Sequence, residues 1–309
     1  MSAETIARAL GGEYRAGSWW RARCPVHGSN GASLALTEGQ NGVVAYCHGG
    51  CSRLAVMTEL RRLRLIDAET RPSADELSRQ RDVLAKRQEA EAAERKRKIA
   101  EGLDIWADSY PADATGQIGR YLGSRGILIP IPPTLRLHGM FGSYGWHPAG
   151  GRWPQMVALI EHVEHGPVGV SRTFLIRDGS AKVGIDPVRL FKGAAKGGAV
   201  RLGPVKPGEW LAVGEGVETV LSVMQSCELA GWAALSATGL ESLMLPAEAD
   251  RVLIAGDNDA NARGQRAALI AARRFRREGR RVKVIIPPVP DTDWNDVLLG
   301  RAPGVVRHG

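Results

Sequence analysis

Apolar segments that alternate with polar ones predict a parallel sheet in the last third of the chain. Four short apolar runs have the length of buried strands, at residues 210–213, 232–235, 252–256 and 282–286. A helix is expected at residues 217–224, and a longer basic helix at 262–278 ends next to Gly279, which suits a C-cap. Strands that alternate with helices favour an α/β fold in which helices flank the sheet.

The N-terminal part shows shorter patterns of a different kind. Two strands are expected at residues 33–36 and 43–46, and an amphipathic helix follows at 54–65. A stretch rich in Ala, Glu and Arg begins at Ala74 and has the composition of a solvated linker helix.

The middle of the chain favours antiparallel pairing. Strands are expected at residues 156–161 and 168–176, with Gly166-Pro167 between them as the turn signal. The chain then divides into four predicted parts: a β-rich domain, a charged helical linker, a basic mixed α+β subdomain and the α/β domain, at residues 1–66, 67–115, 116–206 and 207–309.

Three predicted strands of the α/β domain end at acidic residues. Glu215 follows the first strand in a Gly-Glu-Gly turn, Asp257 and Asp259 follow the third, and Asp293 lies beyond the fourth. Ligands gather at the carboxyl ends of parallel strands, and carboxylate oxygens suit Mg²⁺. The sequence predicts a magnesium site there, although Asp257 and Asp259 are also suitable caps for the helix that follows.

A second metal site is predicted near the N-terminus. Cys24, His27, Cys47 and Cys51 follow the pattern C-x2-H-x19-C-x3-C, in which two ligand pairs flank the two predicted strands. Paired ligands at two turns are typical of a tetrahedral structural Zn²⁺ site. The other reading is that these cysteines are small core residues of a reduced protein.

Other cysteines and histidines are expected to have no metal role. His48 is adjacent to Cys47, so the two cannot easily bind one ion together. Cys227 lies in an apolar helix and is expected to be an inert buried thiol. His162 and His165 flank Glu164 and are expected on a solvated hairpin.

The charge balance favours a nucleic-acid partner. The formal net charge is +8 over 309 residues, and phosphate is the usual partner of a strongly basic protein. No apolar stretch could span a bilayer and no signal pattern opens the chain, so we expect a cytoplasmic protein without a membrane partner. The nucleotide-binding pattern of helicases is absent.

The acidic residues and their spacing resemble the Toprim domain of bacterial-type primases, topoisomerases and related nucleases. The resemblance implies that Glu215 acts as a general acid or base or binds metal, and that Asp257, Asp259 and Asp293 bind Mg²⁺ or Mn²⁺. Cellular primases usually have aspartates at the positions of Thr219 and Asn295. These two departures resemble the primase-like proteins of phages and mobile elements.

The Cys-Pro-x-His and Cys-His-x-x-Cys turns resemble the N-terminal zinc ribbon of primases, with one additional residue between the last two cysteines. Together the resemblances imply a DNA primase that makes short RNA primers on a single-stranded DNA template from nucleoside triphosphates, with a separately encoded replicative helicase. The subdomain before Toprim would then bind template and nucleotides through basic residues among glycines: Arg172, Lys182, Lys192, Lys196 and Arg201.

Two other functions remain open at this point. A Toprim nuclease would use the same carboxylates to hydrolyse phosphodiesters, and a DNA-binding module derived from a primase would have no activity. Some of the basic residues, Lys182 and Lys196 among them, are also suited to simple solvation.

Overall fold

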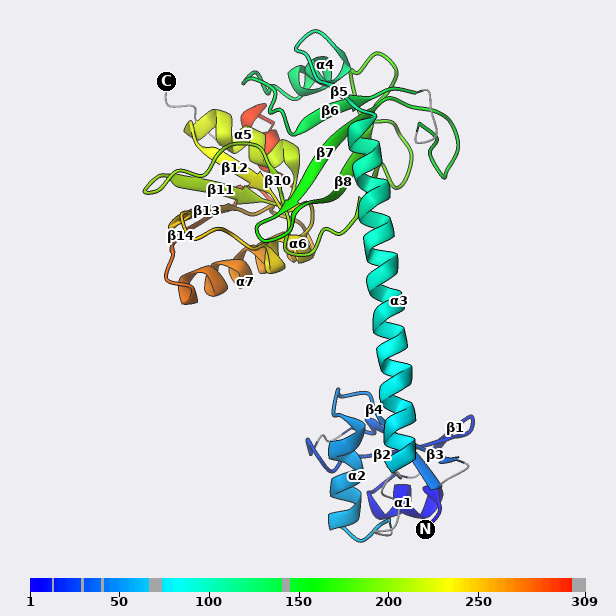
Figure 1. Cartoon of the computed structure of the whole chain (residues 1–309). Coiled ribbons are helices and arrows are strands. Elements are labelled where there is room, and N and C mark those ends of the chain that lie inside the picture. The colour runs from blue at the N-terminus through cyan, green and yellow to red at the C-terminus, as the bar shows by residue number, and fades with distance from the viewer. Residues whose placement is uncertain (13, 29–30, 40–41, 67–73, 141–144, 302–309) are drawn as a thin grey trace. The chain divides into compact units, whose positions relative to one another are not determined.

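The computed structural model describes residues 1–12, 14–28, 31–39, 42–66, 74–140 and 145–301 (Figure 1). The chain forms two compact units, Met1–Gln88 and Glu89–Gly309. The division falls inside helix α3 (Ala74–Ala107). The finer division into four parts at residues 66, 115 and 206 stays a prediction. No helix in the described ranges is both long and apolar enough to cross a membrane.

The first unit is a small antiparallel sheet with two helices. The predicted strands at 33–36 and 43–46 and the helix at 54–65 are confirmed as β3, β4 and α2. Strand order is β1-β2-β3-β4, and Leu34 of β3 pairs with Cys47 of β4. The elements are α1 (Ala3–Ala9), β1 (Tyr14–Ala16), β2 (Trp19–Ala22), β3 (Leu34–Gly39), β4 (Gly42–Cys47) and α2 (Arg53–Arg62).

The second unit begins with an antiparallel sheet of order β5-β6-β7-β8-β9. Its hairpin was predicted, but the turn was misplaced: Gly166 and Pro167 are the first residues of β8, and Pro167 pairs with Glu161 across a β-bulge. The three preceding residues form the turn instead, because the bulge moves the pairing register. The elements are β5 (Tyr110–Pro111), α4 (Gln117–Ser124), β6 (Leu135–His138), β7 (Gln155–His162), β8 (Gly166–Phe174) and β9 (Arg189–Gly193).

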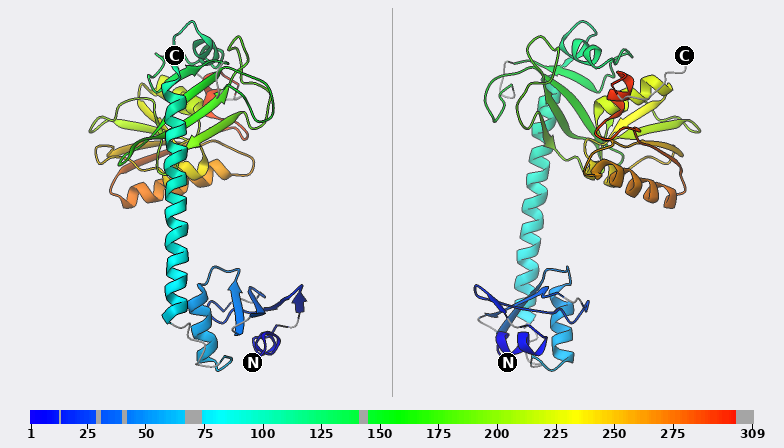
Figure 2. Two further views of the ribbon diagram at one scale, coloured as in Figure 1. Left: turned by 45° about the vertical axis from the view of Figure 1, so that its right-hand side comes forward. Right: turned by 180° about the vertical axis from the view of Figure 1, so that it is seen from behind.

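The C-terminal sheet has the predicted α/β architecture. Its order is β10-β12-β11-β13-β14, and the last four strands of this order run parallel. Figure 2 shows α7 along one face of the sheet and α5 along the other. The elements are β10 (Val200–Arg201), β11 (Trp210–Gly214), α5 (Val217–Cys227), β12 (Ala230–Ala233), α6 (Ala237–Ser242), β13 (Arg251–Ala255), α7 (Arg263–Arg277), β14 (Arg281–Ile285) and α8 (Trp294–Leu298).

A sequence of small residues explains how α7 packs. Its buried face consists of one glycine, four alanines and Phe275, so the helix backbone can approach the sheet closely. Six arginines, Gln265, Leu269 and Ile270 occupy the remaining positions. Gly279, at φ +83°, follows the C-cap residue Glu278 and ends the helix in the left-handed conformation, as predicted.

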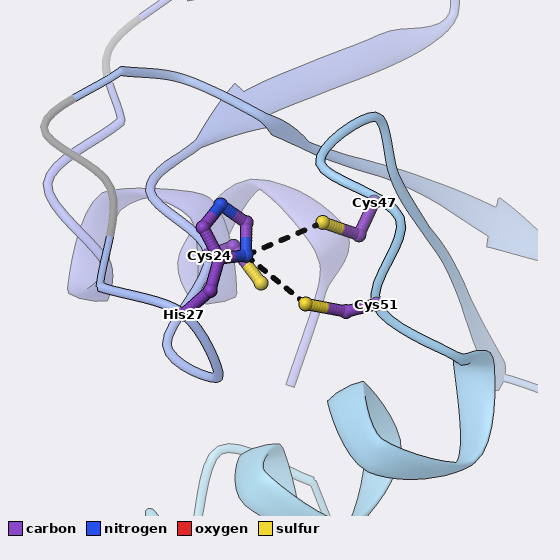
Figure 3. A group of neighbouring side chains, drawn as sticks. All are labelled: Cys24, His27, Cys47 and Cys51. Atoms are coloured by element: carbon purple, nitrogen blue, oxygen red, sulfur yellow. Dashed lines mark hydrogen bonds between the residues drawn. The ribbon is translucent and has the colours of Figure 1, made fainter. Parts of the chain in front are cut away.

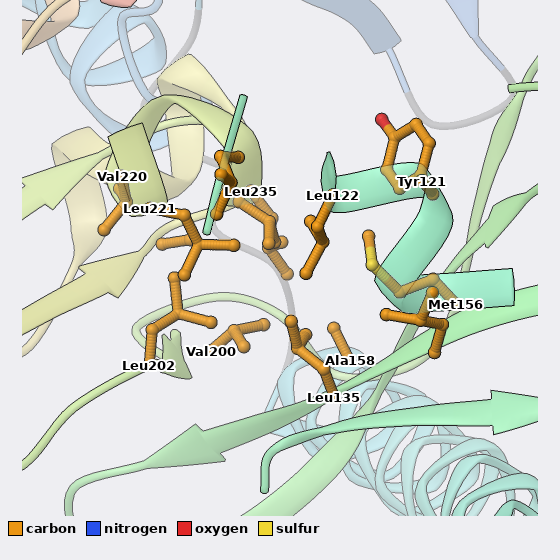
Figure 4. Packing of buried hydrophobic residues seen from close by; sticks show 14 of the residues in the cluster. Tyr121, Leu122, Leu135, Met156, Ala158, Val200, Leu202, Val220, Leu221 and Leu235 are labelled. Atoms are coloured by element: carbon orange, nitrogen blue, oxygen red, sulfur yellow. The ribbon is translucent and has the colours of Figure 1, made fainter. Parts of the chain in front are cut away.

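The two sheets of the second unit share one hydrophobic core. Leu135 and Met156 from the antiparallel part contact the same buried cluster as Val220 and Leu235 from the α/β part (Figure 4). The backbones of Glu161 and Ala199 also exchange two hydrogen bonds, of 2.9 and 3.0 Å. This shared packing fixes the antiparallel sheet next to the strand ends that bear the acidic residues.

Candidate metal sites

The predicted acidic residues leave the same edge of three neighbouring strands. Gly214, the last residue of β11, pairs with Ala255 of β13, and Ala255 pairs with Ile285 of β14. Glu215 and Asp257 therefore begin the loops that follow two adjacent, aligned strands. Asp293 lies in the loop after the third strand and immediately precedes α8.

Two loops are tied to each other at this edge. The amide of Asn258 donates to the carbonyl of Thr292 (3.1 Å), and the amide of Asp291 donates to the carbonyl of Asn258 (2.6 Å). The side-chain amide of Asn258 also donates to the carbonyl of Pro287 (2.8 Å). The residue between the two aspartates therefore acts as a structural connection, and it brings the loop of Asp257 against that of Asp293.

Two of the acids also cap helices. The amide of Gly264 donates to Asp259 Oδ2 (3.0 Å) at the start of α7, and the amide of Asp296 donates to Asp293 Oδ1 (2.8 Å) at the start of α8. Each of these contacts occupies one carboxylate oxygen. Capping therefore fixes the orientation of both side chains and leaves each with a second oxygen, so the capping and metal-binding interpretations are compatible.

Gly264 allows α7 to begin this close to the acids. A Cβ at this position would lie 2.9 Å from the carbonyl oxygen of Asp257 and 3.0 Å from Asp259 Oδ2. Any larger residue would have to displace the loop.

The acids raise one another's pKa. Burial, and then Glu215, Asp293 and Asp259, raise the pKa of Asp257 to about 7. Burial and Asp259 also raise the pKa of Glu215. Repulsion of this kind is relieved when a cation is present among the carboxylates.

The carboxylates at this edge fit a divalent ion, although they do not form a closed site. Glu215 Oε1 is buried without a hydrogen-bond partner in the described structure, which suits an oxygen that would contact an ion. In the described ranges, however, the acids at this edge do not form a group of three with ligand atoms all within 4.8 Å of one another. This arrangement suits Mg²⁺, which usually keeps several waters and takes only one or two carboxylates.

The two departures from the cellular pattern have different surroundings. Thr219 is buried, and its hydroxyl donates to Asp257 Oδ1 (3.4 Å), so a neutral donor stands where a further carboxylate would add repulsion. Asn295 is fully buried, and its amide donates to the carbonyl of Arg125 (2.7 Å) and to Ser222 Oγ (3.0 Å). Asn295 therefore holds α8 in place.

Two arginines near Glu215 were not predicted. Arg263 and Arg189 both lower the pKa of Glu215 and so partly balance its charge. Arg263 contacts Glu241 Oε1 (2.5 Å), and Arg189 donates to the carbonyl of Leu235 (2.8 Å), whose own amide donates to the Glu215 carbonyl (2.7 Å). Nothing in the sequence separates these arginines from the other basic residues, because only the fold brings β9 and α7 to Glu215.

Three of the predicted phosphate-binding cations are paired with carboxylates. Lys192 contacts Glu101, and Arg201 lies 3.8 Å from Glu161 Oε1. Lys182 lies 2.8 Å from Oε1 of the buried Glu218.

The Glu218 contact is part of a buried group. Tyr121 also donates to Glu218 Oε1 (2.5 Å). Although burial opposes it, the attraction of Lys182 holds the pKa of Glu218 down at about 2. This group joins α4, α5 and the segment before β9.

The other two predicted cations differ in exposure. The guanidinium of Arg172 lies 5.7 Å from the ring centroid of the buried Phe174. Lys196 is exposed and lines a cavity. A role of all five cations in binding nucleic acid stays a prediction.

The predicted zinc ligands come together in the first unit. The four ligand atoms of Cys24, His27, Cys47 and Cys51 all lie within 4.8 Å of one another. His27 Nδ1 is 3.0 Å from Cys51 Sγ and 3.7 Å from Cys47 Sγ (Figure 3). Three thiols and one imidazole in this arrangement fit a structural Zn²⁺ site, and His48 is outside the group as expected.

Two further contacts orient the imidazole of His27. Ser33 Oγ lies 3.2 Å from Nε2, so this hydroxyl can accept a hydrogen bond from Nε2–H and leave Nδ1 directed at the thiols. A Cβ at Gly49 would lie 2.6 Å from the ring. Glycine at this position therefore makes room for the ligand.

Two other predictions about cysteines and histidines are wrong. Cys227 is exposed, because it lies in the last turn of α5, beyond the residues that pack on the sheet. His162 is only 6% exposed, because its ring packs against Gly197 in the loop before β10. Glu164 and His165 are exposed as expected.

Comparison with protein families matches residues 210–303 to the Toprim domain and residues 96–202 to a domain of unknown function. Curated proteins give no match. Solved structures that align with the chain include a DnaG primase catalytic domain bound to ssDNA, with 14% identity and a TM-score of 0.42 over 68% of this chain and 79% of that one.

Two other aligned structures extend over most of this chain. The Aquifex aeolicus primase, with its zinc-binding and RNA polymerase domains, has 15% identity and a TM-score of 0.39 over 96% of this chain and 79% of that one. The primase fragment of the bacteriophage T7 primase-helicase has 14% identity and a TM-score of 0.37 over 91% and 95%. The segment 210–303 that matches the Toprim domain contains the parallel strands with acidic residues at their ends.

Proposed function

We propose that this protein is a DNA primase of the phage or mobile-element type, which joins ribonucleotides into short primers on single-stranded DNA. The observation that carries the proposal is the crowding of carboxylates at one edge of the Toprim sheet, where burial and then repulsion by the neighbouring acids raise the pKa of Asp257 to about 7. Phosphoryl transfer needs positioned charge more than covalent help from the protein, and this edge provides a place for that charge.

The residues of the edge have separate roles in this proposal. Asp257, Asp259 and Asp293, with Glu215, would hold Mg²⁺ or Mn²⁺, which when bound would activate the primer 3′-hydroxyl and neutralise the departing pyrophosphate. The helix caps keep Asp259 and Asp293 oriented. Glu215 has a raised pKa and an unpartnered Oε1, so it is suited to accept a proton from the hydroxyl.

In our proposal, the N-terminal unit is the feature that favours a primase over a nuclease. The carboxylates alone are equally suited to a nuclease. A Cys₃His group that fits Zn²⁺, built on a small sheet, is present in the same chain, and we propose that it engages the single-stranded template. The chain has no nucleotide-binding pattern of the helicase type. We propose that a separately encoded replicative helicase unwinds the duplex.

One experiment separates the proposal from its two rivals. End-labelled single-stranded DNA would be incubated with the protein and Mg²⁺, with and without ribonucleotides. Primase activity predicts new RNA products that require nucleotides and leave the labelled template intact. Shortened template without nucleotides would show a nuclease, and unchanged template with no new product would show a binding module. Either of the last two results would refute the proposal.

A further inference from the structure

Helix α7 has an unusual set of side chains on the side that faces away from the sheet. Figure 1 shows the helix, in orange, at the outside of the α/β part of the second unit. Four arginines and two adjacent apolar residues are exposed there, and together they form the outer face of α7: Arg266, Leu269, Ile270, Arg273, Arg276 and Arg277. The helix contains no acidic residue, so this face is purely cationic and apolar.

The arginines of the outer face are not neutralised by the protein itself. Arg263 and Arg274, at the sides of the same helix, form ion pairs with Glu241 and Glu278. Within the described ranges, by contrast, none of the four arginines of the outer face has an ion pair. The carboxylates next to α7 are therefore used at its sides, and its outer face keeps its full positive charge.

The spacing of this face suits contact with another helix. Arg266, Ile270, Arg273 and Arg277 follow one another at intervals of four, three and four residues, which is the repeat by which two helices pack side by side. Like charges one turn apart, as at Arg273 and Arg277, destabilise a helix. Carboxylates of a partner would remove this repulsion.

Two apolar side chains lie in the middle of the stripe. Leu269 is 48% exposed and Ile270 is 46% exposed, and arginines precede and follow them along the face. An apolar centre with a polar rim is the usual composition of a protein–protein interface, where arginine is also enriched. Arginine is moreover the cation that binds carboxylates with two parallel hydrogen bonds.

Other occupants suit this face less well. A nucleic acid backbone would pair with the arginines, but it has nothing apolar to cover Leu269 and Ile270. A second copy of the chain would bring the same positive charges to the contact. A bilayer surface needs a wide apolar face, and α7 buries its wide apolar face on the sheet.

We infer that the outer face of α7 binds an acidic amphipathic helix of a partner protein. Apolar side chains of that helix would cover Leu269 and Ile270, and its carboxylates would pair with the arginines on either side. The acidic edge meets α7 at its first turn, through Gly264, whereas the outer face begins at Arg266 and points away from the sheet. The inference goes beyond the proposed function and does not require that the acidic edge make primers.

Binding of labelled peptides to the full chain, without nucleotides or added Mg²⁺, provides the test. The acidic probe is a helical peptide of about 20 residues, with leucines along one face and glutamates beside them. A scrambled peptide has the same composition and charge but no apolar face, and a lysine probe has lysine in place of every glutamate. Fluorescence anisotropy measures each affinity, and denaturant unfolding checks that each variant is folded.

One pair of variants tests the apolar centre. Leu269→Gln/Ile270→Gln removes it, and Leu128→Gln is the matched control, because Leu128 is 79% exposed in the same unit. We expect the acidic probe to bind the wild type about tenfold more tightly than the scrambled peptide. Leu269→Gln/Ile270→Gln should lose about tenfold in affinity for the acidic probe, and Leu128→Gln should lose less than about twofold.

A second pair tests the charges. Arg266→Glu/Arg273→Glu should lose about tenfold or more for the acidic probe and gain binding of the lysine probe, which the wild type should not bind. Arg177→Glu/Lys206→Glu is the matched control, since it reverses two exposed cations elsewhere in the same unit. It should change either affinity by less than about threefold, because long-range attraction alone is shared by all cations.

The inference is wrong if the acidic and scrambled peptides bind equally well, or if the variants of the outer face lose no more affinity than their controls. A duplex oligonucleotide tests the nearest alternative. If Arg266→Glu/Arg273→Glu loses binding of the duplex, while the acidic probe binds the wild type no better than the scrambled peptide, the face serves nucleic acid and the inference is also wrong.

Discussion

Replacing Asp257 by asparagine should stabilise the metal-free protein at alkaline pH while removing its metal site. Burial and three neighbouring acids raise the pKa of this carboxyl from an ordinary 3.8 to about 7. At about 1.4 kcal/mol for each tenfold change in acidity, that rise corresponds to at most about 4 kcal/mol. Relaxation of the loops will reduce it, so we expect a gain of about 2–3 kcal/mol.

The sign follows from proton binding. Between the unfolded value near 3.8 and the folded value near 7, the folded state holds the extra proton. The free energy of unfolding therefore falls as pH rises through this window, and it stays lower above it. Asparagine has no proton to lose and should remove this pH dependence while still accepting the hydrogen bond from Thr219.

Denaturant unfolding at about pH 5 and about pH 8 measures the effect on both proteins. Glu248→Gln is the matched control, because Glu248 is an exposed acid of the same domain. Added Mg²⁺ should stabilise the wild type and the control but not Asp257→Asn. If the asparagine variant is no more stable than the wild type at alkaline pH without metal, Asp257 is not held among repelling acids.

Three other changes test separate parts of the structure. Gly264→Ala would place a Cβ 2.9 Å from the Asp257 carbonyl oxygen, so it should destabilise the fold by about 1–3 kcal/mol in denaturant unfolding and weaken Mg²⁺ binding in a titration. A gain in stability, as at an unhindered helical glycine, would contradict this geometry. Ser33→Ala should lower Zn²⁺ affinity about 10–100-fold in a chelator competition, and unchanged affinity would exclude its orienting role. Lys182→Met should cost about 3–5 kcal/mol because Glu218 is left buried and unpaired, and restoring stability with Glu218→Gln in the same chain checks that cause.

The acidic edge could be predicted from sequence because its physical basis is local. Glu215 and Asp257 each follow an apolar run, and parallel strands place such positions at one edge. The zinc ligands could be predicted equally well, since Cys24 and His27 form one turn and Cys47 and Cys51 another. In both cases the spacing along the chain already contains the spatial relation.

Contacts between distant elements could not be predicted in this way. Lys182 lies in a run of basic residues that suggests phosphate binding, yet the fold places it beside the buried Glu218. Arg189 and Arg263 come from β9 and α7 and flank Glu215 only after the two parts of the second unit pack together. A sequence pattern gives the charge of such residues but not their partners.

Local errors had equally local causes. The residue preferences of Gly and Pro predict a turn at Gly166, but a bulge at Val168 of β8 shifts the pairing register, and the turn forms at residues 163–165. His162, which the hairpin pattern assigned to solvent, is buried because its ring lies against Gly197 of the loop before β10. A period-two pattern cannot reveal an inserted residue.

Primer synthesis by the Asp257→Asn variant tests the central claim most directly. Wild-type protein, the variant and Glu248→Gln would be given single-stranded templates of varied sequence, labelled ribonucleotides and Mg²⁺. The account predicts short RNA from the wild type and Glu248→Gln, and none from a folded Asp257→Asn protein that still contains zinc. Primers made by Asp257→Asn at the wild-type rate would contradict the assignment of this edge as the catalytic metal site.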